Sequence, residues 1–108
     1  MADLLTAMPG CAVEPARLRI RTDQVGAGYG TLTPAAAEAL ILAACAEGIV
    51  LDPIYTARAL AGLRAAIADG DVRRGQPVVF VHSGGLPSVF GHAAAVDLGN
   101  SGLGRCTS

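Results

Sequence analysis

Two short stretches of the sequence carry side chains that could do chemistry. In "LDPIYTA", Tyr55 and Thr56 occupy the expected first turn of a helix. The free N–H groups of that turn and the positive end of the helix dipole favour a polar ligand. In "HSGG", from His82 to Gly85, one hydroxyl precedes two glycines, which a flat ligand can approach closely because no Cβ intervenes. Both stretches are candidate binding sites.

Each stretch also has a plain structural explanation. Tyr55 and Thr56 can be a core aromatic and a helix-surface threonine, and "HSGG" can be an ordinary turn from a strand into a loop. The glycine-rich "GAGYG" lacks the GxGxxG spacing of a dinucleotide-binding loop. It favours instead a tight loop that presents Tyr29. The residues alone leave these alternatives open.

Two strands are predicted around these stretches. Residues 17–23, "RLRIRTD", alternate polar and apolar as a half-buried edge strand does, with Leu18 and Ile20 on one face. Residues 78–82, "VVFVH", form a continuous apolar run that is typical of a central parallel strand covered on both faces. The carboxyl end of such a strand is where open α/β sheets bind ligands, and "HSGG" lies there.

Two helices are predicted between the strands. Thr33 can cap the first, which begins at Pro34 and stops at Gly48. Asp52 and Pro53 repeat the start signal for a second helix, which extends to about residue 69. Its apolar line is Thr56, Leu60, Leu63 and Ile67, beside a strip of small residues, Ala57, Ala61, Gly62 and Ala65.

These elements make up part of a three-layer α/β/α unit. Two strands cannot form a sheet with both faces covered, so the chain is predicted to be a piece of a larger α/β fold. We place this partial domain at residues 1–92, with a short helix near its end. The remaining residues, 93–108, are rich in glycine and serine and are predicted to be a flexible tail.

Composition narrows the classes of partner. Eight basic and nine acidic residues offer no broad attraction to nucleic acid or to anionic lipid. No apolar run reaches the roughly 18 residues of a membrane span, and no basic signal-peptide start is present. Three widely spaced cysteines favour reduced thiols, and the separations of His82, His92 and Cys106 match no zinc pattern. We interpret the protein as soluble and cytoplasmic, without a metal site.

Hydrophobic residues make up 52% of the chain and charged residues 16%. Such a sequence has few groups to cover its outside, although alanine accounts for much of the apolar share. One hypothesis is therefore a non-catalytic α/β module that uses an uncovered apolar face for self-association.

Three linked motifs carry a resemblance to a known family. In order and spacing, "VGAGYGTLTPAAAEAL", "EGIVLDPIYTARALAGL" and "VVFVHSGGLPSVFG" resemble the C-terminal third of the D-cysteine desulfhydrase and 1-aminocyclopropane-1-carboxylate deaminase family. These are pyridoxal-phosphate (PLP) enzymes of the tryptophan synthase β type, fold type II. The resemblance covers about residues 18–90 and implies the C-terminal part of such a fold, and a homodimer for the full-length family.

The resemblance also implies roles for individual residues. Tyr55 would lie beside the cofactor ring, and Tyr29 in the cleft of a small amino-acid substrate, both as catalytic residues. The cofactor-binding residues would be Ser83, Thr56, Gly84 and Gly85, with Ser83 facing the pyridine nitrogen. A neutral hydroxyl does not stabilise a protonated pyridinium, so the ring is a weaker electron sink, which suits β-elimination.

The implied reaction converts D-cysteine to pyruvate, hydrogen sulfide and ammonia. Deaminases of the cyclopropane substrate generally carry glutamate after the tyrosine and "HLGG" at the strand end, so Thr56 and Ser83 favour the desulfhydrase. A deaminase-like fragment is the alternative within the family. The chain has no lysine, whereas the cofactor needs a lysine amine to form its Schiff base. We therefore expect the isolated chain to be inactive, although its family is one of lyases.

Relative to the family pattern "YTGKAMAGL", two positions differ at the start of the second helix. Ala57 stands in place of glycine and Arg58 in place of lysine. Arginine keeps the charge but replaces a compact ammonium with a planar fork of donors.

Overall fold

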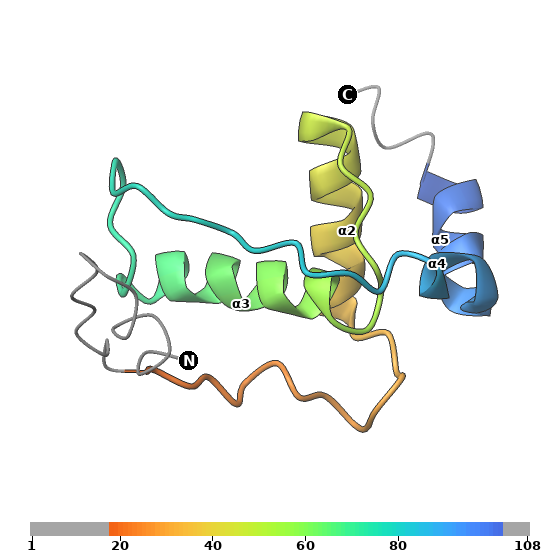
Figure 1. Ribbon diagram of the computed structural model, residues 1–108, viewed down its shortest axis with the longest axis horizontal. Helices are drawn as coiled ribbons and strands as arrows, with labels where there is room; N and C mark the ends of the chain where they lie inside the picture. The colour runs from red at the N-terminus through yellow and green to blue at the C-terminus, as the bar shows by residue number, and fades with distance from the viewer. Residues whose placement is uncertain (1–17, 103–108) are drawn as a thin grey trace, which may run out of the picture.

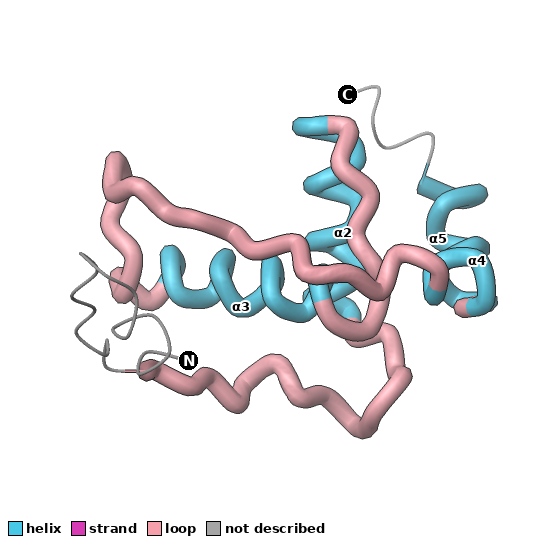
Figure 2. Tube along the Cα trace, viewed as in Figure 1, coloured by secondary structure: helices cyan, strands magenta, loops and turns pink. Residues whose placement is uncertain are grey.

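The computed structural model describes residues 18–102, which contain four helices and no strand (Figures 1 and 2). The helices are α2, Pro34–Glu47; α3, Thr56–Ala68; α4, Ser88–Gly91; and α5, Ala93–Gly102. Two extended segments, residues 18–22 and residues 76–83, lie outside them. Figure 1 shows both running along the length of α3, one on either side in that view.

Helix α2 forms where the sequence predicts it. The Thr33 side chain accepts a hydrogen bond from the Ala36 N–H at 3.2 Å, and Pro34 takes the first helical position. At the other end Gly48 has a φ of 66° and its N–H bonds the Ala44 carbonyl at 3.0 Å. The left-handed conformation suits glycine, because it has no Cβ to clash. The predicted helix is confirmed at both ends.

Helix α3 is also confirmed, although it begins at Thr56 rather than at Pro53. Its buried residues are Thr56, Ala57, Ala61 and Ala66. Ala57 and Ala61 of the small-residue strip therefore face inward, as does Thr56 of the predicted apolar line, whereas Ile67 of that line is half exposed. Small side chains let α3 pack closely on α2. Their core comprises Ala36, Ala43, Leu51 and Ala57, with Leu32, Leu40, Leu60 and Phe80 packed against it.

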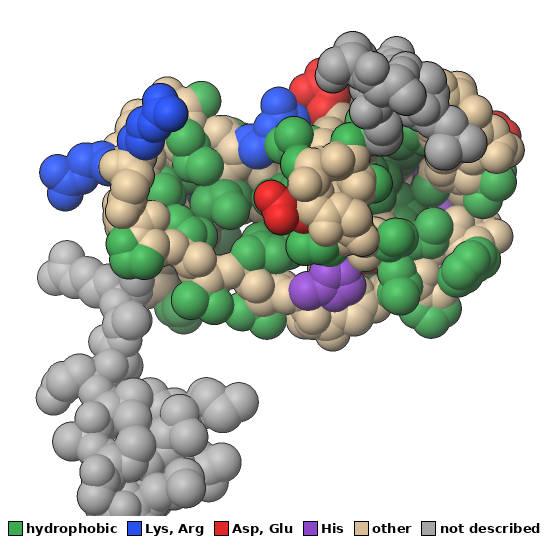
Figure 3. All heavy atoms as spheres, turned by 90° about the horizontal axis from the view of Figure 1, so that it is seen from above, with side chains coloured by type: hydrophobic (Ala, Val, Ile, Leu, Met, Phe, Trp, Pro, Cys, Tyr) green, Lys and Arg blue, Asp and Glu red, His purple; other side chains and the backbone are tan. Residues whose placement is uncertain are grey.

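Neither predicted strand forms in residues 18–102, so the α/β class is not confirmed there. Leu18 and Ile20 are 89% and 84% exposed, and Val79 is 90% exposed. The predictions of a half-buried and a doubly covered strand are thus wrong for this chain. The physical reason is non-local: a strand needs neighbours for its hydrogen bonds and its faces. No neighbouring strand is present in the described part, and Figure 3 shows apolar side chains spread over its surface.

The predicted tail begins as a helix. Residues 93–102 form α5, which packs against α2 and α4, while residues 103–108 lie outside the described part. The Ala93–Val96 run favours helix strongly enough to outweigh the later glycines. The boundary at residue 92 stays a prediction. The predicted short helix near the end of the partial domain is confirmed as α4.

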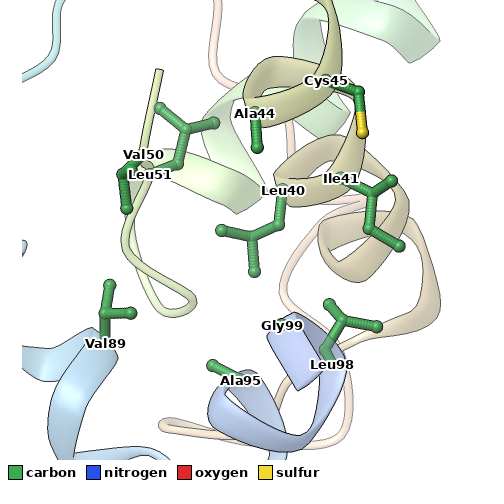
Figure 4. A pocket seen from close by; sticks show the side chains of 10 residues that line it. All are labelled: Leu40, Ile41, Ala44, Cys45, Val50, Leu51, Val89, Ala95, Leu98 and Gly99. Atoms are coloured by element: carbon green, nitrogen blue, oxygen red, sulfur yellow. The ribbon is translucent and has the colours of Figure 1, made fainter. Parts of the chain in front are cut away.

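A pocket of about 230 Å³ lies between α2 and α5 (Figure 4). The labelled side chains of Leu40 and Ile41 from α2 and Leu98 from α5 point toward it, and Leu51 and Val89 lie at its other side. Cys45 of α2 also lines the pocket and is disulfide-bonded, so the expectation of reduced thiols is wrong for this residue. None of the described helices is long and apolar enough to cross a membrane.

Candidate functional site

Two tyrosines from separate segments meet at the start of α3. The hydroxyls of Tyr29 and Tyr55 share a hydrogen bond. Their ring centroids lie 6.2 Å apart with an interplanar angle of 63°, an edge-to-face arrangement. Both side chains are exposed. The loop presents Tyr29, as the sequence predicts, and the structure places it against the start of α3, where the two proposed catalytic residues are brought together.

The turn that carries Tyr55 is built around the carboxylate of Asp52. This buried group accepts hydrogen bonds from the N–H groups of Ile54 at 2.9 Å, Tyr55 at 2.7 Å and Thr56 at 2.8 Å. It also accepts one from the Thr56 hydroxyl at 2.6 Å. Burial alone would raise the pKa of Asp52, but these hydrogen bonds outweigh it and lower the pKa below its usual value. The carboxylate holds three otherwise free N–H groups of the helix start.

Thr56 belongs to this buried turn and not to an open surface. Its side chain is almost fully buried, and its hydroxyl both donates to the Asp52 carboxylate and accepts from the Asp52 N–H at 2.8 Å. A hydroxyl with these partners supports the backbone that orients Tyr55. Its direct binding of a cofactor stays a prediction.

The end of the "HSGG" stretch lies against the same turn. Gly85 has a φ of 85°, and a Cβ added there would lie 2.7 Å from the carboxyl carbon of Asp52. That separation is too short for any side chain. Only glycine can therefore occupy this position, which places residues 83–85 beside the start of α3. The convergence of the two candidate stretches, expected from the resemblance, runs through Gly85 and Asp52.

Ser83 and Gly84 lie at the outer part of this junction. Both are exposed, and the Ser83 hydroxyl has no hydrogen-bond partner among residues 18–102. A Cβ at Gly84 would meet nothing within 4 Å. The space beside these two residues is open to a ligand. Their cofactor-binding roles, like that of Gly85, stay predictions.

Two histidines anchor the segments of the site, which the sequence did not predict. His82 Nε2 lies 3.1 Å from the Val50 carbonyl oxygen, and His92 Nε2 lies 2.8 Å from that of Gly30. The first bond ties the "HSGG" stretch to the loop before Asp52. The second ties the loop of Tyr29 to the junction of α4 and α5. Within the described part of the chain, no cluster of histidine, cysteine and acidic residues could hold a metal ion.

Arg58 is a further residue that the sequence did not single out as part of the site. It donates from Nη1 to the Val25 carbonyl at 2.9 Å, and from Nη2 to the carbonyls of Gly28, at 2.9 Å, and Thr31. All three acceptors belong to the loop that carries Tyr29. A signal was present, since a cation in the first turn of a helix opposes the helix dipole and calls for another partner.

Tyr55 carries its proton at neutral pH. The hydrogen bond with Tyr29, followed by desolvation and by the charges of Tyr29 and Asp52, raises the pKa of Tyr55 above its usual value. One phenol donates to the other, so the pair can release or accept a proton with little movement. This is the chemistry that the described residues themselves offer.

Comparison with curated proteins identifies similar sequences. D-cysteine desulfhydrases of Salmonella newport (strain SL254), Salmonella heidelberg (strain SL476) and Salmonella enteritidis PT4 (strain P125109) are each 38% identical to the chain over 77 residues. The match covers 71% of this chain and 24% of each relative. The chain therefore spans about a quarter of the length of these curated relatives. No protein-family model matches it.

The similarity to these desulfhydrases agrees with the resemblance carried by the three motifs. Its extent is that of a segment, because three quarters of each relative has no counterpart in the match. This similarity over 77 residues is consistent with a C-terminal segment of the D-cysteine desulfhydrase family.

Proposed function

We propose that this chain forms part of the active site of a PLP-dependent lyase that converts D-cysteine to pyruvate, hydrogen sulfide and ammonia. The observation that carries the proposal is the hydrogen-bonded pair of Tyr29 and Tyr55, held at the start of α3 beside the "HSGG" stretch. The 38% identity to D-cysteine desulfhydrases supports the same substrate. Thr56 and Ser83, rather than glutamate and leucine, favour this substrate over the cyclopropane amino acid.

The residues at the site fit one side of a pyridoxal-phosphate ring. Ser83 has an exposed hydroxyl without a partner in the described part, and Gly84 beside it leaves room for a flat ligand. The covalent attachment of pyridoxal phosphate does not fit this chain, because its 108 residues contain no lysine. The amine must come from another polypeptide segment, in keeping with a chain that spans 24% of its relatives.

Each residue then has a defined task. When bound, pyridoxal phosphate supplies an electron sink for the bond broken at the substrate α-carbon. The Ser83 hydroxyl would hold the ring at its nitrogen and would give that nitrogen no negatively charged partner. The sulfur of D-cysteine leaves with an electron pair, and the tyrosine pair holds a proton that it can deliver to that sulfur. Asp52 fixes the turn from which Tyr55 projects.

Complementation tests this proposal. The chain would be mixed with a Salmonella D-cysteine desulfhydrase polypeptide that lacks the matched segment, in the presence of pyridoxal phosphate. We expect release of sulfide from D-cysteine, and loss of most of it in Tyr55→Phe and Ser83→Ala. Ser101→Ala is the matched control, since its hydroxyl caps carbonyls of α5 away from the site. Sulfide release that survives both site substitutions would contradict the proposed site.

A second candidate function is self-association without catalysis. Its support is the exposure of apolar residues on both extended segments, including Ile20 at 84% and Val79 at 90%. Size-exclusion chromatography separates the two hypotheses. A chain that runs as a monomer over a range of concentrations contradicts self-association. A stable oligomer that gives no sulfide on complementation favours it.

A further inference from the structure

The loop that carries Tyr29 is wrapped around one side chain of α3. Arg58 reaches the carbonyls of Val25, Gly28 and Thr31, which surround the loop from both sides of Tyr29. A Cβ at Gly26 would lie 3.8 Å from Arg58 Nη2 and 2.6 Å from Thr33 Cγ2. The loop therefore closes so tightly on the arginine and the cap of α2 that residue 26 has no space for a side chain.

Arg58 lies where a positive charge is unfavourable, and its hydrogen bonds explain why an arginine is found there. Arg58 is the third residue of α3, where the helix dipole disfavours a positive charge. Among residues 18–102 it has no acidic partner, and its hydrogen bonds there all go to loop carbonyls. A planar fork with several N–H donors can span three carbonyls, whereas a lysine ammonium directs its donors from a single nitrogen.

From these contacts we propose that Arg58 is a positioning residue that holds the Tyr29 hydroxyl on the Tyr55 hydroxyl. The guanidinium fixes the loop on both sides of residue 29, and Tyr55 lies three residues before Arg58 on the same turn of chain. One side chain thus sets the separation of the two phenols. The catalytic meaning of this role rests on the proposed function, but the positioning itself does not.

The chain offers a direct spectroscopic readout of this pair. It contains two tyrosines, Tyr29 and Tyr55, and no tryptophan, so its tyrosinate absorbance reports on this pair alone. In the unaltered chain we expect part of the titration to occur above the ordinary tyrosine value of about 10, because the shared hydrogen bond favours the neutral phenol of Tyr55.

In Arg58→Met the loop loses its three bonds, and we expect Tyr55 to titrate at lower pH than in the unaltered chain, because it loses the hydrogen bond with Tyr29. The direction of the change in the pKa of Tyr55 is diagnostic, because removal of a positive charge without any movement of the loop would instead raise this pKa. Arg64→Met is the matched control, since Arg64 lies on the same helix and pairs with Glu38 at 3.3 Å on the surface. Its titration should equal that of the unaltered chain.

Arg58→Lys serves as the milder variant if Arg58→Met does not fold. We expect it to retain the circular dichroism of the unaltered chain and only part of the raised titration. In a Tyr29→Phe background Tyr55 should titrate at lower pH than in the unaltered chain, and Arg58→Lys should change nothing further. A folded Arg58→Met, or Arg58→Lys where the former does not fold, with an unchanged titration overturns the proposal. So does an equal shift of Tyr55 in the absence of the Tyr29 hydroxyl.

The titration also separates this inference from the proposed function. Complementation without sulfide release, together with a titration that depends on Arg58, would contradict the proposed lyase function and support the positioning role. Sulfide release together with an unchanged titration in the Arg58 variants would support the lyase function and contradict the positioning role.

Discussion

Helices α2 and α3 differ from the two extended segments in how well the chain itself satisfies their backbone groups and covers their apolar side chains. The helices satisfy their backbone groups internally and bury a seam of alanines between them. The extended segments have strand-like sequences, yet their apolar side chains are exposed. Local signals are sufficient for the helices, because each bond joins residues four apart. A strand is completed only by a neighbour, and residues 18–102 supply none.

Asp52 organises the start of α3 and lies against Gly85, just beyond the second extended segment, and its removal should have the largest effect. Asp52→Ala leaves three backbone N–H groups and the Thr56 hydroxyl without their acceptor. We expect a loss of about 2–3 kcal/mol in the free energy of unfolding, measured by urea titration of the helical circular dichroism. Asp97→Ala, at an exposed position of α5, is the control and should cause little change. A loss below that of the control would contradict the capping role.

The same carboxylate predicts a dependence on pH. The pKa of Asp52 is lower in the folded chain than in the unfolded chain. Its contribution is therefore complete above about pH 4, the unfolded value, and is lost as the pH falls through the lower folded value. Asp52→Ala should flatten this part of the stability profile. If the stability of the variant fell at low pH as steeply as that of the unaltered chain, another group would be responsible for the loss.

A pair of substitutions contrasts the two regions directly. Ala57 is fully buried between the helices, and Ala57→Leu should destabilise the chain by about 1–3 kcal/mol through overpacking. Val79 is 90% exposed, and Val79→Thr should change the stability of the chain by no more than about 0.5 kcal/mol. When the chain is complemented, the difference between the two losses of stability should shrink or reverse if residues 78–82 become a covered strand. Equal effects in the isolated chain would contradict the contrast.

The smallest effect should come from the ion pairs that hold residues 18–22. Arg21 lies 2.7 Å from Asp69, 3.0 Å from Asp23 and 3.3 Å from Asp71. Its hydrogen bonds hold the pKa of Asp23 well below the usual range. Because these groups are exposed, Arg21→Gln or added salt should speed hydrogen exchange in residues 18–24 without changing the unfolding midpoint. A shifted midpoint would show that this segment belongs to the cooperative core.

The helices of the chain were predictable because their signals are local. Thr33, Pro34 and Gly48 mark both ends of α2 at their own positions, and Asp52 marks the approach to α3. The strand predictions failed at Leu18 and Val79 because periodicity reports what a segment can pair with, not whether the pair is present. Helix α5 was missed because glycine and serine content outweighed the alanine run in the prediction.

The site was predictable only in part. Tyr29 and Tyr55 came from motif resemblance, and the structure brings their hydroxyls together. The bonds of Arg58, His82 and His92 to loop carbonyls span 27 to 62 residues of sequence, and no local pattern specifies such partners. The substrate, cofactor and dimer remain proposals that rest on the family.

Because Gly85 and Asp52 are in contact, the residue types allowed at these two distant positions depend on each other. A larger residue at 85 would push aside the carboxylate that organises the helix start, and a shorter residue at 52 would open a space that glycine does not fill. Substitutions at the two positions should therefore be fixed together or not at all as related sequences diverge. The exposed Ser83, which does not bond Asp52, can change without disturbing this contact.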